Sequence, residues 1–319
     1  NRLGWKWKHY VVTIDNLLNN ITESAIHGCE YSPIHLHAIP QIRDDNPDIE
    51  VILGGSYGDS VGRAEYSGKK VQYLKPLDQN ITNVGKFIHK NIYKNSLNHI
   101  WKDLGIYHKL FPEKELYMQN ELDYQLHYLR RMLNPCMQLL NEKTEFYQVF
   151  THPDVFGFMW SIRPEKRNDK VYGEMMKLFK TNLNDIPWSR TGLPFGEKKG
   201  IPDSFSQKHH NYPKQINEII YKKLDKTEFL NKLNSLNVIN TKAIDYWLSL
   251  LKKRQTSNLL YLEKLLWFVS LAKMCEIYNI EGIDKQSSMD TYIKFPILFE
   301  YIKVNTKVYF RKIINKSKA

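Results

Sequence analysis

The feature that most restricts the fold of this chain is a short apolar strand that runs directly into a glycine-rich loop. Residues 49–53 read Ile-Glu-Val-Ile-Leu, and residues 54–59 read Gly-Gly-Ser-Tyr-Gly-Asp. Such a β-branched run is typical of a buried strand, and glycines let a backbone turn sharply beside a ligand. A strand that ends in this kind of loop is typical of α/β proteins, which bind ligands at the carboxyl ends of parallel strands. The sequence therefore predicts an α/β fold with its site at this loop.

The stretch before this strand predicts one more strand and two helices. Residues 9–14 form a β-rich run, and Asp15 is the expected N-cap of an amphipathic helix that ends near Ile26. A further helix is expected after Pro33. This order is typical of a parallel sheet, but two strands cannot cover both faces of one. We therefore expect earlier strands upstream of residue 1, where the chain also shows no initiator Met.

From about residue 80 onward the pattern is mainly helical. Residues 113–142 carry apolar side chains at helical spacing, and Pro135 is expected to kink or split that helix. Further helices are predicted at 153–162, 170–179, 215–236, 241–252 and 258–278. A polar loop at 187–206 contains three prolines and three glycines. We predict two domains: an α/β domain at 1–200 that is incomplete at its N-terminus, and a helical extension at 201–319.

The glycine loop carries the first set of candidate site residues. We expect it to hold the phosphates of a nucleotide through its backbone N–H groups, with a carboxylate holding Mg²⁺ on a pyrophosphate. The cofactor-binding residues are then Gly54, Gly55, Ser56, Gly58 and Asp59, with Asp59 as the metal ligand. The alternative is a plain strand-to-loop turn in which Asp59 forms an Asx-turn.

Two later segments complete the set. Residues 146–165 form a proline-led aromatic segment whose Phe and Trp side chains are expected to pack in a core. Residues 188–195 read Trp-Ser-Arg-Thr-Gly-Leu-Pro-Phe. Arg190 in this loop either clamps a phosphate or is a surface arginine in a turn.

The order and spacing of these segments resemble the synthetase domain of the asparagine synthetase family. The resemblance runs from Arg2 to about Gly196, and the opening Arg-Leu-Gly at residues 2–4 is similar to the segment that follows the first ATP-binding loop of that family. It implies a nucleotide-binding domain of the ATP-pyrophosphatase (HUP-like) kind, followed by a mostly helical region. It also implies ATP and Mg²⁺ as cofactors, and an amide ligase that adenylates a carboxylate, usually aspartate, before ammonia from a glutaminase domain attacks.

The same resemblance assigns catalytic roles to Arg190 and Thr191, which fall in the family's loop of basic residues around the transferred phosphate. The family's signature ATP loop, Ser-Gly-Gly-x-Asp-Ser, is absent, so we expect it upstream and expect this chain alone to be inactive. Three positions depart from the family pattern: Ser56 replaces a glutamate, Ser60 replaces the second acid of an Asp-Glu pair, and Thr191 replaces a lysine. A diverged or inactive relative that acts in glycan or secondary-metabolite biosynthesis is therefore an alternative.

Composition restricts the remaining alternatives. The net charge is +12, and a basic tail favours a nucleic-acid-binding module, with side chains Lys303, Lys307, Arg311, Lys312, Lys316 and Lys318. The basic residues are nevertheless spread along the chain, which makes nucleic acid an unlikely partner. The three cysteines are an odd and sparse count without paired spacing, which argues against a disulfide scaffold and a zinc site. No apolar run of a spanning length and no signal peptide occur, so we expect a bacterial cytoplasmic protein with a small carboxylic acid as substrate, and a homodimer remains open.

Overall fold

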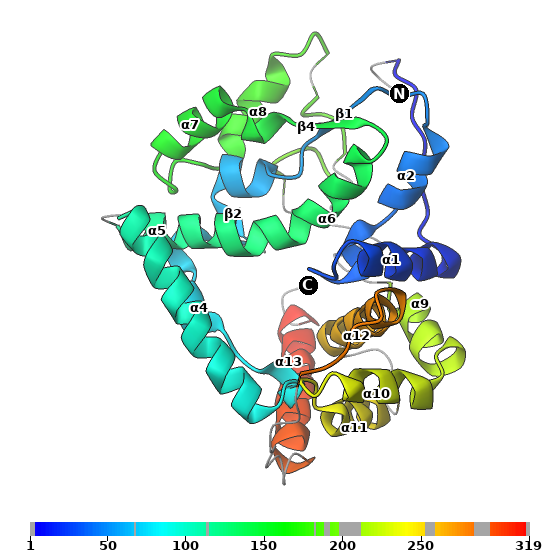
Figure 1. The fold of residues 1–319 in the computed structure, drawn as a ribbon. Coiled ribbons are helices and arrows are strands. Elements are labelled where there is room, and N and C mark those ends of the chain that lie inside the picture. The colour runs from blue at the N-terminus through cyan, green and yellow to red at the C-terminus, as the bar shows by residue number, and fades with distance from the viewer. Residues whose placement is uncertain are drawn as a thin grey trace. The chain divides into compact units, whose positions relative to one another are not determined.

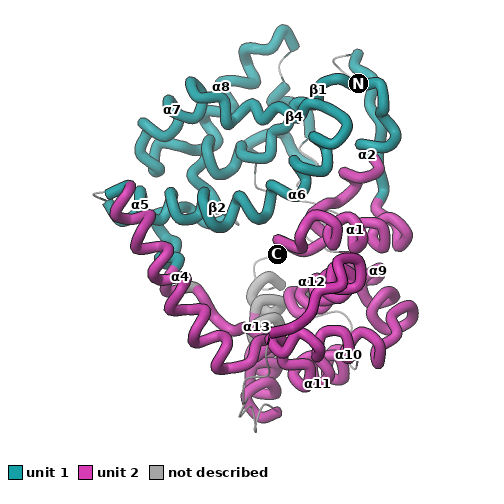
Figure 2. The backbone as a smooth tube through the Cα atoms, viewed as in Figure 1, with its two compact units in different colours: residues 1–11, 42–77, 111–210 teal, residues 12–41, 78–110, 211–319 magenta. Residues whose placement is uncertain are grey.

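The computed structural model describes residues 4–66, 68–112, 115–181, 183–187, 192–197, 212–252, 259–283 and 294–316. Helices predominate and the strands are short, which confirms a helix-rich α/β fold (Figure 1). In the described ranges no helix combines the length and the apolar character that crossing a membrane requires. The elements pack into two compact units, one of residues 1–11, 42–77 and 111–210, the other of residues 12–41, 78–110 and 211–319 (Figure 2). Each unit is interrupted in sequence, whereas the predicted domains 1–200 and 201–319 are continuous.

The first unit contains both small sheets. Strand β1 (Val51–Gly54) pairs in parallel with β4 (Glu145–Gln148), and a hairpin joins β2 (Glu65–Tyr66) to β3 (Lys69–Lys70). Its helices are α5 (Leu116–Asp123), α6 (Arg130–Asn141), α7 (Pro153–Ser161) and α8 (Asp169–Lys177). Short 3₁₀ or π turns lie at Gly58–Gly62, Val71–Tyr73, Tyr124–Leu129 and Val149–Thr151. The strand predicted at residues 49–53, now β1, was expected to belong to a parallel sheet. Its partner β4 begins the segment that was expected to pack aromatic side chains in a core.

The second unit is helical. It contains α1 (Ile14–Ile26), α4 (Lys90–Leu110), α9 (Pro213–Glu218), α10 (Lys226–Ser235), α11 (Thr241–Lys252), α12 (Leu259–Ile277) and α13 (Lys294–Lys316), with short turns at Pro33–Leu36, Val84–Lys86 and Ile219–Lys223. Two short helices, α2 (Ile39–Asp45) and α3 (Leu77–Asn80), lie where the chain passes from one unit to the other. Helix α1 packs along α12. Fully buried Trp247 stacks on Tyr261 with ring centroids 3.8 Å apart and donates a hydrogen bond to the carbonyl of Gly85 at 3.0 Å.

The predicted strand at residues 9–14 is wrong. Residues 9–13 join no strand in the described part of the chain, and Ile14 is the first residue of α1. Thr13 is the N-cap: its hydroxyl accepts from the Asn16 amide at 3.2 Å, and the Asn16 side chain accepts from the Thr13 amide at 2.9 Å. This reciprocal capping box starts the helix two residues before the expected cap at Asp15.

Two predicted helices also differ. Residues 215–236 form two helices, because Asp225 accepts from the amides of Thr227 and Glu228 and begins α10. Pro135 lies inside α6 and does not split it. Leu139 and Leu140 are buried beyond the proline, and this packing outweighs the loss of one backbone hydrogen bond.

A buried ion pair holds the first unit together. Arg167 is fully buried, and its Nη2 lies 2.7 Å from Oε2 of Glu121 on α5. Its Nη1 donates to the carbonyl of Val61 in the turn after the glycine loop at 3.2 Å, and its own carbonyl accepts from Lys70 of β3 at 2.8 Å. Burial raises the pKa of Glu121, although Arg167 opposes the change. One arginine therefore connects a helix, a hairpin and the site loop.

Replacement of Glu121 by Ala is expected to lower the free energy of unfolding by about 3–5 kcal/mol, because it leaves the guanidinium of Arg167 buried without a counter-charge. Urea unfolding followed by circular dichroism measures the change. Glu121→Gln keeps an acceptor for Arg167 and should lose less. A loss below about 1 kcal/mol for Glu121→Ala, the size of an exposed pair, would contradict this role.

Candidate functional site

The candidate site lies where the two parallel strands end. Gly54 and Gln148 are register partners at the carboxyl ends of β1 and β4, so the loops that follow them leave the same edge of the sheet. This edge is where α/β sheets bind ligands. Of the predicted residues, Gly54 ends β1, Gly55 and Ser56 lie in the loop that follows, and Gly58 and Asp59 lie in the next turn. Arg190 and Thr191 lie outside the described residues.

The side chain of Gln148 bridges the two strand ends. It is only 4% exposed, and its Oε1 accepts a hydrogen bond from the amide of Ser56 at 3.3 Å. Because an N–H donor must face an oxygen, this bond fixes the orientation of the carboxamide and leaves Nε2 as a donor. Within the described residues Nε2 is buried and has no hydrogen-bond partner. A buried donor without a partner lowers the stability of a fold by about 1–3 kcal/mol. A ligand with an acceptor atom at the glycine loop would remove this cost.

Glycine is required at two positions around this loop. A Cβ on Gly54 would collide with the ring of Phe146 and would lie 3.0 Å from Nε2 of Gln148. A Cβ on Gly62 would collide with the phenol of Tyr172, which donates a hydrogen bond to the carbonyl of Gly58. Burial raises the pKa of Tyr172 to about 12, so its hydroxyl stays protonated as a donor at neutral pH. Close packing of aromatic rings on glycines therefore fixes the path of the loop.

Asp59 lies in the single-turn π helix at Gly58–Gly62, and its side chain is 61% exposed. Its Oδ1 is 3.1 Å from Nη1 of Arg63, and Nε of Arg63 is 2.9 Å from Oδ1 of Asp169. The guanidinium of Arg63 also lies over the ring of Tyr172, 5.0 Å from its centroid. Two carboxylates share one arginine, so the group carries one excess negative charge, which suits a cation at the exposed Asp59.

Ser60 does not supply a second carboxylate-like ligand. Its side chain is 2% exposed, and its hydroxyl donates to the carbonyl of Tyr57 at 3.2 Å. A metal ion at this loop would therefore have Asp59 as its carboxylate ligand in the described turn, with its remaining positions taken by phosphate oxygens and water, as is common for Mg²⁺.

Sequence reasoning missed Gln148, Arg63 and Tyr172. A signal existed for Gln148, because it is the polar residue in an apolar run, Phe-Tyr-Gln-Val-Phe, at residues 146–150. Nothing in the sequence predicts that Arg63 bridges Asp59 and Asp169 or that Tyr172 lies beside Gly62. These contacts join residues far apart in the chain, which spacing arguments do not reach.

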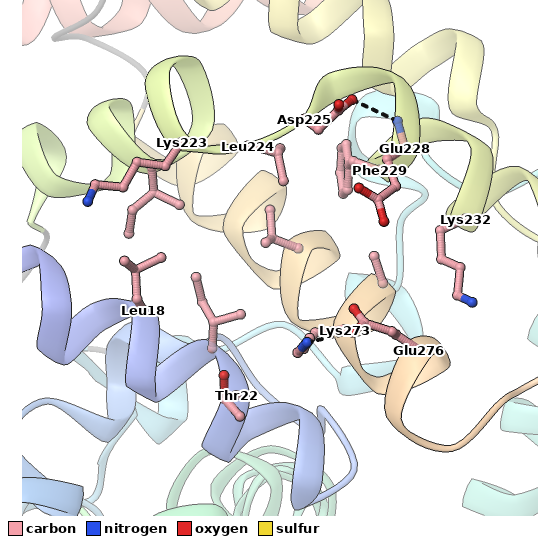
Figure 3. A pocket seen from close by; sticks show the side chains of 14 residues that line it. Leu18, Thr22, Lys223, Leu224, Asp225, Glu228, Phe229, Lys232, Lys273 and Glu276 are labelled. Carbon is pink, nitrogen blue, oxygen red and sulfur yellow. Dashed lines mark hydrogen bonds and ion pairs between the residues drawn. The ribbon is translucent and has the colours of Figure 1, made fainter.

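A separate cavity lies in the second unit between α1, α10 and α12, with a volume of 360 Å³ (Figure 3). Leu18 and Phe229 belong to its apolar lining, and three lysines and three carboxylates also line it (Figure 3). Lys273 pairs with Glu276 at 2.7 Å. The opposite charges balance, so this cavity shows no preference for an anion or a cation.

Comparison of the chain with protein-family models, with curated proteins and with solved structures gives no match. Any functional interpretation therefore depends on the geometry of the loop and of the side chains around it.

Replacement of Gly62 by Ala is expected to lower the free energy of unfolding by about 1–3 kcal/mol, because the added methyl group displaces the ring of Tyr172. Gly157→Ala is the matched control: a Cβ on Gly157 meets no atom within 4 Å, and the residue lies inside α7. Alanine at position 157 should raise the free energy of unfolding by about 0.5–1 kcal/mol, because alanine favours a helix more than glycine does. Thermal unfolding of the two variants measures both, and equal effects would refute the close packing at Gly62.

Proposed function

We propose that this chain is the phosphate-binding part of an ATP-dependent amide ligase of the asparagine-synthetase kind, with a HUP-like first unit. The observation that supports it is the buried Nε2 of Gln148, which has no hydrogen-bond partner among the described residues and lies where two parallel strands end. The loop at Gly54–Ser56 lies beside it and leads along the chain to Asp59. A buried donor that requires an acceptor, a glycine loop that approaches closely and an exposed carboxylate are together suited to a magnesium-bound pyrophosphate.

Each group has a distinct task in this proposal. Nε2 of Gln148 donates to a phosphate oxygen, and the Ser56 amide holds the carboxamide in the required orientation. Asp59 provides the carboxylate for Mg²⁺, which supplies positive charge on the phosphates. Arg63 positions Asp59 through their ion pair, and Asp169 in turn holds Arg63 through a second ion pair. In such a ligase ATP transfers AMP to a carboxylic acid, pyrophosphate leaves, and ammonia then displaces AMP to form the amide.

A second candidate is a diverged member of the same family with another acceptor acid, or one without catalysis. Two features favour it: Ser60 is buried and bound to Tyr57, and Asp59 already forms an ion pair with Arg63. Metal binding with one carboxylate, partly neutralised, is weaker than with an acidic pair. The acceptor is aspartate or another carboxylic acid, and the nitrogen comes from a glutaminase domain or from free ammonia.

Asp59→Ala is expected to weaken the binding of pyrophosphate in the presence of Mg²⁺ by about tenfold or more, about 1.4 kcal/mol, because it removes the carboxylate that holds the metal. Isothermal titration calorimetry measures the dissociation constant with and without Mg²⁺. Asp48→Ala, an exposed aspartate in the same unit, is the control and should bind as the unaltered chain does. Binding that ignores both Mg²⁺ and Asp59 would exclude this metal site.

The reaction class is tested by ATP–pyrophosphate exchange in the presence of aspartate or of other carboxylic acids. Exchange that depends on aspartate is expected for an asparagine-synthetase-like ligase. Exchange with other carboxylic acids alone supports the diverged relative, and no exchange with any acid in a protein that binds ATP indicates lost catalysis.

A further inference from the structure

We propose that the second unit carries an anion site of its own, a pocket at the start of α4 that binds a small phosphorylated molecule. The pocket has a volume of 600 Å³ and is lined by the turn at Val84–Lys86, the first residues of α4, Asn240 and the first two turns of α13. Small-molecule sites typically have volumes of about 300–1,000 Å³. This site does not involve the glycine loop, so the proposal of an anion site does not depend on the proposed ligase activity.

The charges that line the pocket are mainly positive. Lys86, Lys90 and Lys94 all line it, and none of them forms an ion pair with another described residue. Glu300 is the acid among the lining residues, and it is already engaged: its Oε1 accepts from the amide of Gly85 at 3.1 Å and from the hydroxyl of Tyr261. Burial, reinforced by Glu300, raises the pKa of Tyr261, so this hydroxyl remains a donor to the carboxylate. Three lysines against one carboxylate therefore leave the lining with an excess of two positive charges.

The wall that presents Lys86 is rigid. Gly85 and Lys86 both have positive φ, 67° and 57°, a conformation that a lysine rarely adopts. The buried Trp247 holds the carbonyl of Gly85, and the Asn83 side chain donates to the carbonyl of Ile88 at 2.7 Å and accepts from its amide at 3.2 Å. Strain that the surrounding structure enforces is a pointer to a functional position. At Lys86 this backbone conformation fixes the direction in which the side chain extends from the turn.

The shape of the pocket indicates the kind of anion. Tyr93, Ile88 and Pro296 provide apolar lining beside the lysines, which leaves room for an organic group next to a phosphate. Three cations against one engaged carboxylate match a phosphate ester or a diphosphate. A nucleic-acid strand requires a groove with stacking aromatic rings and a basic track, whereas these lysines surround a pocket with one tyrosine in its lining.

The test is isothermal titration of the 319-residue chain with inorganic pyrophosphate and with phenyl phosphate, without Mg²⁺. We expect binding that weakens as salt rises. The variant Lys86→Gln/Lys90→Gln/Lys94→Gln should bind about 3- to 150-fold more weakly, since an exposed charge pair contributes about 0.2–1 kcal/mol and three of them act together. Asp59→Ala should bind as the unaltered chain does, which separates this pocket from the glycine loop.

The matched control is Lys102→Gln/Lys109→Gln/Lys214→Gln, which removes the same charge from exposed positions on α4 and α9. It should change the affinity by less than about twofold, because distant exposed charges are screened by salt. Thermal unfolding confirms that both triple variants are folded. Equal loss in the two triple variants, or no loss in the pocket variant, overturns the proposal. So does a single-stranded oligonucleotide that binds more tightly than phenyl phosphate and loses affinity equally in both variants.

Discussion

The ion pair between Arg167 and Glu121 is the interaction on which the first unit depends. A pair as deeply buried as this one is not a strong source of stability, because the cost of removing both charges from water offsets their attraction. Its importance is geometric. The same guanidinium binds the carbonyl of Val61, and its residue's own carbonyl binds Lys70, so the helix, the hairpin and the turn around the site cannot move independently.

The site loop inherits its geometry from that arrangement. The turn at Gly58–Gly62 is held from one side by Arg167 and from the other by Tyr172, which fills the space that a side chain at Gly62 would take. A loop fixed in this way does not need to reorganise when a ligand arrives, which is the condition for a strong interaction with a charged group. The unpartnered carboxamide of Gln148 is then a group prepared for a ligand, since its orientation is set in advance by Ser56.

Local patterns in the sequence were sufficient for part of this structure. The strand before Gly54, the helix-rich remainder and the position of the five loop residues at a strand end follow from residue type and spacing alone. The strand expected at residues 9–14 does not form, because a capping box at Thr13 and Asn16 starts a helix there. The β-branched residues that suggested a strand carry no signal of this cap. Strand β4 and the contacts of Gln148 and Tyr172 depend on pairing across about a hundred residues or on ring packing, and neither leaves a periodic signal. The metal-binding and catalytic roles stay predictions, and Arg190 and Thr191 stay untested by geometry.

The interleaving of the two units has a consequence for how the chain is made. Helix α1 is synthesised well before the helix that packs on it, α12, which begins at Leu259, so the apolar side chain of Leu17 stays exposed until the residues between them have been made. Pairings between distant segments form slowly, because the loop between them must close before any contact is gained. A nascent chain with interleaved units exposes apolar surface for longer than one whose domains follow each other, so it depends more on chaperones until α12 has been synthesised.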